Sequence, residues 1–372
     1  MKILIAPDKF KGSIGSVALC NVVGEEIHAI MPDAILTKMP LADGGDGFSG
    51  IIRHYFRTES IAVETTDPLG RPLSALYQFD ADTRTAYIEM SAASGLALLQ
   101  PEERDPLKTS TRGTGLMIAD AIAHGAARIV LGIGGSATND AGTGMAHALG
   151  YRFLHKQGKE LEPAGGNLCD IDTIIPPHHD IMQGVECLVA CDVKNPLYGH
   201  DGAAYVYAPQ KGATTDMVEL LDRGLRHMDE LFRSHFGRSM ALAEGAGAAG
   251  GMGAGAEIFL GARMISGMAF LAAALGLEDH IRRADIIITG EGRFDDQSFS
   301  GKVVGEVAAL ARKYGKPVWV ICGSSSVTLQ DCLASGITRI TDIASIAPDT
   351  VTSIRDPEPY IRIAVRKWWP QG

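Results

Sequence analysis

The chain has 372 residues, of which 46% are hydrophobic and 21% are charged, and this globular composition excludes a long disordered tail. Its 34 lysine and arginine residues against 44 aspartate and glutamate residues give a formal net charge of −10, which disfavours non-specific binding to nucleic acid or to an anionic membrane. An anionic substrate therefore requires a local basic pocket. At this length we expect two domains with a cleft between them.

The cysteines and the apolar segments indicate a protein of the cytoplasm. The six cysteines form no C-x-x-C pair and have no histidine partner at zinc spacing, so we expect buried, reduced thiols rather than a structural metal site. The first residues, MKILIAPDK, contain too short an apolar run for a secretory signal, and no apolar stretch reaches transmembrane length. We therefore expect a cytoplasmic protein whose partner is a small-molecule substrate.

The chain begins with alternating strands and helices. Residues 2–6 are predicted to form a strand, and residues 16–31 an amphipathic helix that ends at Pro32. A strand at 35–39 and a helix at 46–56 repeat this order, which is typical of parallel β-α units.

Charged loops follow both of these strands. Lys9 and Lys11 come after the first strand and would point the same way in an extended loop. In open α/β sheets ligands bind at this carboxyl edge, so the two lysines suit a phosphate or a carboxylate. After the second strand, Asp43 could bind a hard cation such as Mg²⁺, whereas Asp46 is interpreted as the N-cap of the next helix.

The pattern changes in the middle of the chain, which favours an inserted second domain. Residues 74–79 and 85–90 read as strands, and glycine becomes more frequent. The glycine-rich segment 245–255 is interpreted as a linker. Because the helix-like segment 259–276 follows it directly, a cofactor contact or a lid hinge is the alternative.

The sequence GIGGSATNDAGTG at 132–144 follows the apolar run 129–131, which reads as a buried strand. A strand that opens into such a turn and then into a helix presents backbone N–H groups to an anion. Ser136, Thr138 and Asn139 add more polar groups than a turn needs for its closure. These residue types are also common in ordinary turns, so the segment alone leaves both interpretations open.

Two further loops carry candidate functional groups. Arg112 lies in a hydroxyl-rich loop before a predicted helix. Asp192 follows the apolar run 188–190 and has Asn195 nearby, so it could be a general base for a hydroxyl group or a Mg²⁺ ligand. Capping of the turn before Pro196 is the alternative role for Asp192.

The strand-then-helix order returns at the end of the chain. A strand at 284–289, a helix at 302–314 and a strand at 318–322 are predicted. The loop after the first of these strands combines carboxylates, hydroxyls and cations, among them Glu291, Arg293 and Lys302. Similar polar loops at three strand ends favour a shared ligand site.

Loops rich in N–H groups, several carboxylates and separate cations point to phosphoryl transfer. The chain lacks both the P-loop motif and the protein-kinase signature set, so another phosphate cradle is required. A dinucleotide-dependent hydroxy-acid dehydrogenase is one alternative, because residues 132–137 match G-x-G-x-x-A. A non-catalytic two-lobed binding protein is another, although it leaves the many acids and bases unexplained.

Taken together, the motifs resemble those of the bacterial glycerate kinase type-1 family, in order and over nearly the whole chain. The motifs are APDKFKGS at 6–13, PLADGGDG at 40–47, TSTRGTG at 109–115, GIGGSATNDAGTGMA at 132–146, ACDVKNPLYG at 190–199, APQKGA at 208–213 and TGEGRFDDQSFSGK at 289–302. The resemblance implies ATP-dependent phosphorylation of D-glycerate, with Mg²⁺ as the metal. The expected product is 2-phosphoglycerate, and phosphorylation of the 3-hydroxyl is the alternative.

The resemblance also implies an α/β protein of two α/β domains. One domain is Rossmann-like, with a mainly parallel sheet built from both chain ends at 1–72 and 285–372, and the other is inserted between them at 73–284. The number of subunits does not follow from the sequence.

The roles of single residues rest on their chemistry. We expect Asp192 to accept the proton of the attacking hydroxyl, Lys9 to assist transfer as a catalytic cation, and Asp43 and Glu291 to hold Mg²⁺. The expected phosphate- and substrate-binding residues are Lys11, Ser13, Arg112, Ser136, Asn139, Asn195, Arg293 and Lys302.

Overall fold

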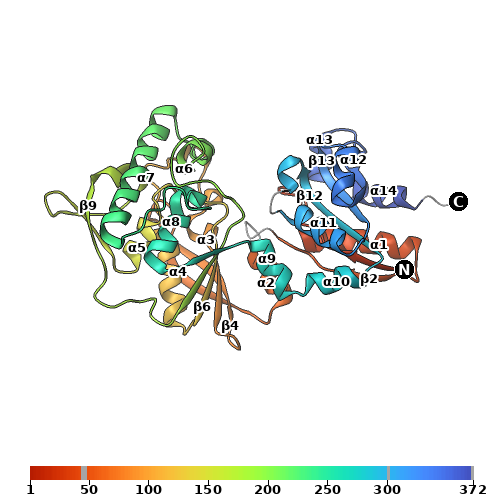
Figure 1. Ribbon diagram of the computed structural model, residues 1–372, viewed down its shortest axis with the longest axis horizontal. Helices are drawn as coiled ribbons and strands as arrows, with labels where there is room; N and C mark the ends of the chain where they lie inside the picture. Colours follow the sequence, from red (N-terminus) through yellow and green to blue (C-terminus); the bar gives the residue numbers. More distant parts are fainter. Residues whose placement is uncertain (43–47, 300–301, 370–372) are drawn as a thin grey trace. The chain divides into compact units, whose positions relative to one another are not determined.

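The protein, studied as a computed structural model, is described over residues 1–42, 48–299 and 302–369 (Figure 1). It divides into two compact units: unit 1 comprises Met1–Asp43 and Ser266–Gly372, and unit 2 comprises Gly44–Ile265. Both are mixed α/β units with parallel strands, as expected. Within unit 1, elements from the first part of the chain (red) lie together with elements from its last part (blue).

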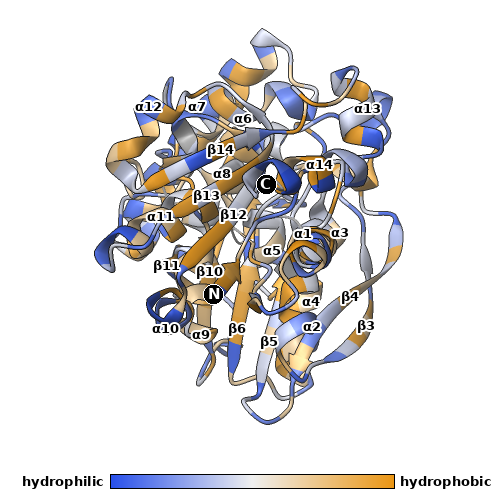
Figure 2. Ribbon diagram, turned by 90° about the vertical axis from the view of Figure 1, so that its right-hand side faces the viewer, coloured by the Kyte–Doolittle hydropathy of each residue, from blue (hydrophilic) through white to orange (hydrophobic). Residues whose placement is uncertain are grey.

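Unit 1 is built on a parallel sheet in the order β14-β13-β12-β1-β2. Its strands are β1 (Lys2–Ile5), β2 (Ile35–Lys38), β12 (Ile286–Phe294), β13 (Val318–Ser325) and β14 (Ile337–Asp342). Strands β12 and β13 are predominantly hydrophobic (Figure 2), which is typical of parallel strands that are buried on both faces. Because β1 pairs in parallel with β12, the predicted sheet built from both ends of the chain is confirmed.

Helices cover this sheet and complete the core of unit 1. They are α1 (Ser16–Ile30), α9 (Gly267–Ala274), α10 (Leu277–Arg283), α11 (Val303–Lys313), α12 (Leu329–Cys332), α13 (Thr350–Arg355) and α14 (Glu358–Trp368). In α1, Leu19, Val23 and Ile27 recur at four-residue intervals and are fully buried, as the predicted amphipathic pattern requires. They share one hydrophobic cluster with Ile361 and Val365 of α14.

Unit 2 contains a mixed sheet in the order β11-β10-β6-β5-β4-β3. The strands are β3 (Glu59–Thr66), β4 (Pro72–Asp80), β5 (Thr85–Glu89), β6 (Arg128–Gly132), β10 (Glu186–Ala190) and β11 (Arg263–Ile265). The last four are parallel to one another, whereas β3 and β4 pair in antiparallel fashion. The carboxyl ends of β5, β6, β10 and β11 therefore meet at one edge of the sheet.

The remaining elements of unit 2 pack around this sheet. Its helices are α2 (Phe48–Tyr55), α3 (Ser91–Ser94), α4 (Arg112–Ala123), α5 (Thr143–Ala148), α6 (Ala203–Tyr207), α7 (Thr215–Phe236) and α8 (Ala248–Leu260). A small second sheet has the order β8-β7-β9 and consists of β7 (Arg152–His155), β8 (Glu160–Leu161) and β9 (Ile171–Ile175).

The division between the units differs from the expected boundaries at residues 72 and 284. Strand β3 pairs with β4 along its whole length, with Glu59 opposite Phe79 and Thr66 opposite Pro72, so it belongs to the sheet of unit 2. At the other boundary, α10 contacts β1 and α11 and so belongs to unit 1. In both places strand pairing and helix packing, rather than a change of composition, decide which unit a segment joins.

The linker interpretation of residues 245–255 is wrong, because this segment is buried and much of it forms α8. A Cβ atom at Gly250, whose φ is +73°, would lie 2.0 Å from the Thr138 carbonyl oxygen, and one at Gly255 would lie 2.2 Å from the Ala141 carbonyl oxygen. The glycines therefore allow the backbone of α8 to approach the loop after β6. The predicted helix over 259–276 is also interrupted, since α8 ends at Leu260, Gly261 is its C-cap, and β11 follows.

We expect Gly255→Ala to lower the free energy of unfolding by about 1–3 kcal/mol, because the new methyl group has no space against the Ala141 carbonyl. In an unobstructed helix the same change raises stability by up to about 1 kcal/mol. Gly50→Ala in α2 is the matched control, since nothing lies within 4 Å of a Cβ atom there. Urea denaturation measures the free energy of unfolding of both variants. If both were stabilised equally, the close contact between Gly255 and the Ala141 carbonyl would be contradicted.

Candidate active site

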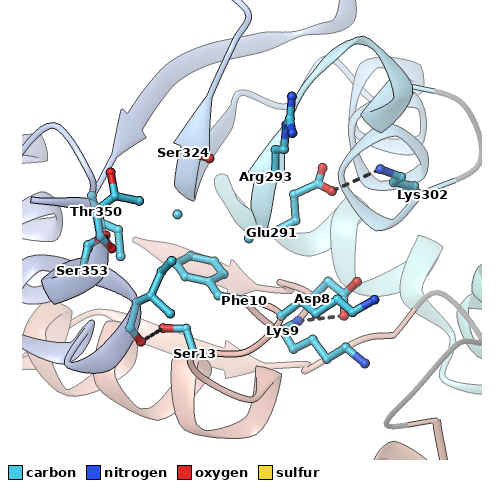
Figure 3. A pocket seen from close by; sticks show the side chains of 15 residues that line it. Asp8, Lys9, Phe10, Ser13, Glu291, Arg293, Lys302, Ser324, Thr350 and Ser353 are labelled. Carbon is cyan, nitrogen blue, oxygen red and sulfur yellow. Dashed lines mark hydrogen bonds and ion pairs between the residues drawn. The ribbon is translucent and has the colours of Figure 1, made fainter. Parts of the chain in front are cut away.

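A pocket of about 460 Å³ opens at the carboxyl ends of the strands of unit 1 (Figure 3). It brings together predicted site residues from distant parts of the sequence, namely Lys9, Lys11, Ser13, Glu291, Arg293 and Lys302. Asp8 also lines it, with Phe10, Ile343 and Ile354 forming apolar parts of its wall. The pocket therefore combines cations, carboxylates and an apolar surface.

Backbone pairing places the two main loops of this pocket side by side. The loop after β1 continues along β12, because the Ala6 N–H donates to the Ile288 carbonyl at 2.7 Å and the Asp8 N–H donates to the Gly290 carbonyl at 2.8 Å. On β12, Glu291 and Arg293 are two positions apart and so stand on the same face. The close approach of the two loops involves Gly292 on β12, where a Cβ atom would lie 3.0 Å from the Lys11 backbone nitrogen and 3.2 Å from the Phe10 Cα atom.

The charges of the pocket are arranged around Glu291, which is 8% exposed. The Lys302 ammonium lies 3.9 Å from its Oε2 atom, and Lys302 is also the N-cap residue of α11. The guanidinium of Arg293 lies 3.3 Å from the Asp295 carboxylate and its side chain is largely exposed. Two cations beside the N-terminus of a helix form an environment that attracts anions.

Ser13 has a structural contact in the same pocket. Its hydroxyl donates a hydrogen bond of 2.6 Å to the Ile354 carbonyl (Figure 3). This bond ties the loop after β1 to α13 and commits the hydroxyl proton of Ser13, so the side chain can offer a ligand only its oxygen as an acceptor.

In unit 2, the loop between β6 and α5 is held in place by Asp140. Its fully buried carboxylate accepts hydrogen bonds from the Thr111 N–H at 2.7 Å, the Thr111 hydroxyl at 2.8 Å, the Gly144 N–H at 3.2 Å and the Gly142 N–H at 3.3 Å. Burial raises the pKa of Asp140, and these donors oppose that shift. The Asp140 carboxylate therefore stabilises the conformation of this loop. That role agrees with the interpretation of the segment as an ordinary turn.

Lys211 is the functional candidate that the sequence reasoning missed. It is 2% exposed, and its ammonium donates to the Ser136 hydroxyl and to the Thr138 carbonyl, each at 2.7 Å. Burial lowers its pKa to about 7, while the charge of Asp140 acts in the opposite direction. The available signal was the lysine among small residues in APQKGA, which by itself does not reveal burial.

Asn139 is fully buried beside this lysine-bound loop. Among the described residues, neither its amide nitrogen nor its amide oxygen has a hydrogen-bond partner, and the Thr138 hydroxyl lacks one as well. Buried polar side chains are nearly always paired. These unpaired groups lie directly beside the Asp140 carboxylate, which accepts several hydrogen bonds.

The other predicted residues of unit 2 have mixed roles. The Arg112 guanidinium lies 3.0 Å from Nδ1 of His147. The amide of Asn195 donates to the Asp201 carbonyl and accepts from the Tyr207 hydroxyl, so it closes its own loop.

Asp192 follows β10, and β10 pairs with β6 so that Ala190 lies opposite Gly132. The loops that carry Asp192 and Ser136 therefore leave neighbouring points of one sheet edge. Asp43, the other expected Mg²⁺ ligand, and Asp46, the expected helix cap, lie outside the described residues.

In the described part of the chain, no helix has the length and apolar character needed to cross a membrane. Four of the cysteines are buried, as expected, whereas Cys191 is partly exposed and Cys169 is exposed. All six are free thiols.

Comparisons with known proteins agree with the motifs. The model of the Glycerate kinase family matches residues 3–369. The chain is 43% identical to Glycerate 2-kinase of Escherichia coli (strain K12), over 87% of this chain and 85% of that protein. It is 42% identical to Glycerate kinase of Bacillus subtilis (strain 168), over 88% and 86%. A crystal structure from Salmonella typhimurium LT2 superposes with a TM-score of 0.83 at 38% identity, covering 99% and 97% of the two chains.

The lowered pKa of Lys211 predicts a pH-dependent contribution to stability. Its pKa is about 7 in the folded protein and about 10.4 in an unfolded chain, so between these values the unfolded state binds more protons. Burying the ammonium destabilises the folded state fully below pH 7, and this destabilisation declines as the pH rises toward 10. The contribution of Lys211 to the free energy of unfolding therefore rises with pH.

We expect Lys211→Met to remove that rise. Urea denaturation of both proteins at pH 7, 8 and 9 measures the effect as the difference between their free energies of unfolding. A difference that stays constant across this range would show that Lys211 keeps the pKa of an ordinary lysine.

Proposed function

The chain belongs to the glycerate kinase family, and we propose that its pocket in unit 1 binds the phosphates of ATP. The enzyme is a kinase that phosphorylates glycerate, as the motifs of its sequence predict. The dehydrogenase and the non-catalytic binding protein considered from the sequence are not supported. The observation that carries the ATP assignment is the group of cations, Lys9, Lys11, Arg293 and Lys302, that line one pocket beside the N-terminus of α11.

The shape and charge of this pocket support a polyphosphate ligand. Its volume of about 460 Å³ falls within the range of about 300–1,000 Å³ that is common for cofactor and ligand sites. Catalysis of phosphoryl transfer depends mostly on positioning and on neutralising the charge of the phosphates. Lysine and arginine side chains from β12 and from the loop after β1 can both position the phosphates and neutralise their charge. We assign Lys9 to the transferred phosphate.

We propose that Mg²⁺ is held by carboxylates of the same pocket. Mg²⁺ usually binds through one or two carboxylates, with substrate phosphates and waters as its other ligands. Glu291 and Asp8 both line the pocket, so the donor set fits this mode, and Asp43 stays a predicted ligand outside the described residues. When bound, the ion would neutralise phosphate charge and orient the phosphates for transfer.

We propose that Asp192 accepts the proton of the attacking hydroxyl. It lies just beyond β10, at the sheet edge from which the loop with Ser136 and Asn139 also departs. A carboxylate within hydrogen-bond reach of a hydroxyl can act as its general base.

The 2-hydroxyl of D-glycerate is the proposed acceptor, and the similarity to Glycerate 2-kinase supports this choice over the 3-hydroxyl. Phosphorus NMR of the product distinguishes them, because a phosphate on carbon 2 couples to one proton and a phosphate on carbon 3 couples to two.

Lys302→Met is expected to raise the KM for ATP about 10- to 100-fold, the effect of losing one charge-assisted hydrogen bond to a phosphate, with little change in the KM for glycerate. Lys313→Met is the matched control, because Lys313 lies at the other end of α11 and pairs with Glu278. Steady-state kinetics with each substrate varied in turn provides the measurement. An unaltered KM for ATP in Lys302→Met would remove this residue from the site.

Asp192→Asn is expected to lower kcat by about 10²- to 10⁴-fold, the usual contribution of a general base, without changing the unfolding temperature. Asp201→Asn, an exposed position on the same loop, is the control and should keep normal turnover. Kinetics combined with thermal unfolding separates a chemical effect from a folding defect. Near-normal kcat in Asp192→Asn would refute its role as the base.

A further inference from the structure

We propose that Lys211 and Asn139 bind the carboxylate and a hydroxyl group of glycerate in unit 2. This inference rests on the proposed function, in which glycerate is the phosphoryl acceptor. It adds a residue, Lys211, that the sequence analysis did not select, and it assigns Asn139 to the acid rather than to the nucleotide.

The ammonium of Lys211 has hydrogen-bonding capacity that the protein does not use. An ammonium group has three N–H donors, and two of them are bound by the Ser136 hydroxyl and the Thr138 carbonyl. In the described part of the chain no carboxylate forms an ion pair with it, since the Asp140 oxygens accept hydrogen bonds from Thr111, Gly142 and Gly144 instead. A buried lysine without an anionic partner is rare, and a bound carboxylate would supply that partner.

Asn139 is the second, independent observation. Its side chain is 0% exposed, and among the described residues both ends of its amide lack hydrogen-bond partners. Each unsatisfied buried group carries a desolvation cost. The neighbouring Asp140, by contrast, is fully bonded. The unpaired amide therefore offers donors and an acceptor to a ligand, and the neighbouring Thr138 hydroxyl, which is also unpaired, could add to them.

The Lys211 ammonium lies close to the backbone of Asn139. Thr138 O, which accepts from Lys211 at 2.7 Å, is one peptide bond away from Asn139. Standard bond lengths then place the ammonium at most about 5 Å from the Asn139 backbone nitrogen.

Backbone strain at Ala141, whose φ is +53°, is maintained by a hydrogen bond from its N–H to the Gly250 carbonyl.

The available groups match a hydroxy acid better than a nucleotide. The ammonium and the amide NH₂ are donors that suit a carboxylate, and the amide oxygen accepts a hydrogen bond from a hydroxyl group. A triphosphate carries several negative charges and calls for several cations, which the pocket of unit 1 offers and this loop does not. Asp192, the proposed base, follows the strand next to the one that precedes this loop.

Binding of D-glycerate and of a non-hydrolysable ATP analogue, measured separately by calorimetry, tests the proposal. Asn139→Leu replaces an unpaired buried amide with an apolar side chain of similar size, so we expect unchanged or increased thermal stability. We also expect affinity for glycerate to fall at least tenfold while affinity for the ATP analogue stays unchanged. Lys211→Met is expected to weaken glycerate binding to the same degree, and it answers the same question if Asn139→Leu does not fold.

Asn167→Leu is the matched control. The Asn167 amide donates to the Glu162 carbonyl and accepts from the Ala164 N–H, so its loss should reduce stability and leave glycerate binding intact. The inference is overturned if wild-type protein binds glycerate and the Asn139 and Lys211 variants bind it equally well, or if those variants lose the ATP analogue instead. Wild-type protein that neither binds nor phosphorylates glycerate would overturn the proposed function itself, which is a distinguishable result.

Discussion

The parallel pairing of β1 with β12 is the interaction on which the pocket of unit 1 depends. It brings together residues from opposite ends of the chain, as in the hydrogen bond from the Thr289 hydroxyl to the Ala6 carbonyl, 283 positions away. Because parallel strands end at the same edge of a sheet, the loops after β1 and β12 emerge together. Lys9 and Glu291 reach one pocket for this reason.

In unit 2, loops after neighbouring parallel strands also emerge at one edge of the sheet, but some buried polar groups there lack hydrogen-bond partners among the described residues. Strands β6 and β10 are neighbours, and the loop after β6 is packed against the glycines of α8. Asp140 is satisfied by several donors, whereas Asn139 is not. Natural proteins tolerate such local costs mainly where function requires them. The burial of Lys211 belongs to the same pattern, since desolvation of an ammonium is unfavourable unless something compensates for it.

Much of the fold was predictable because its signals are local. The spacing of Cys20, Val23, Ile27 and Ile30 and the apolar run before Gly132 depend only on neighbours in the sequence, and both elements form where expected. The failures have long-range causes. The segment 245–255 reads as a linker by composition, yet a Cβ atom at Gly255 would meet the Ala141 carbonyl. Likewise, β3 joins unit 2 because β4 pairs with it.

The sequence by itself determined the family, the reaction class and the strand ends at which polar loops gather, because motifs and hydrophobic periodicity are written in consecutive residues. Only the tertiary structure decided which of these residues share a pocket. It also decided that the Asn195 side chain is hydrogen-bonded to Asp201 and Tyr207 and that Lys211 is buried. The physical reason is that burial, hydrogen-bond partners and the pKa shifts that follow from them depend on contacts between residues far apart in the chain.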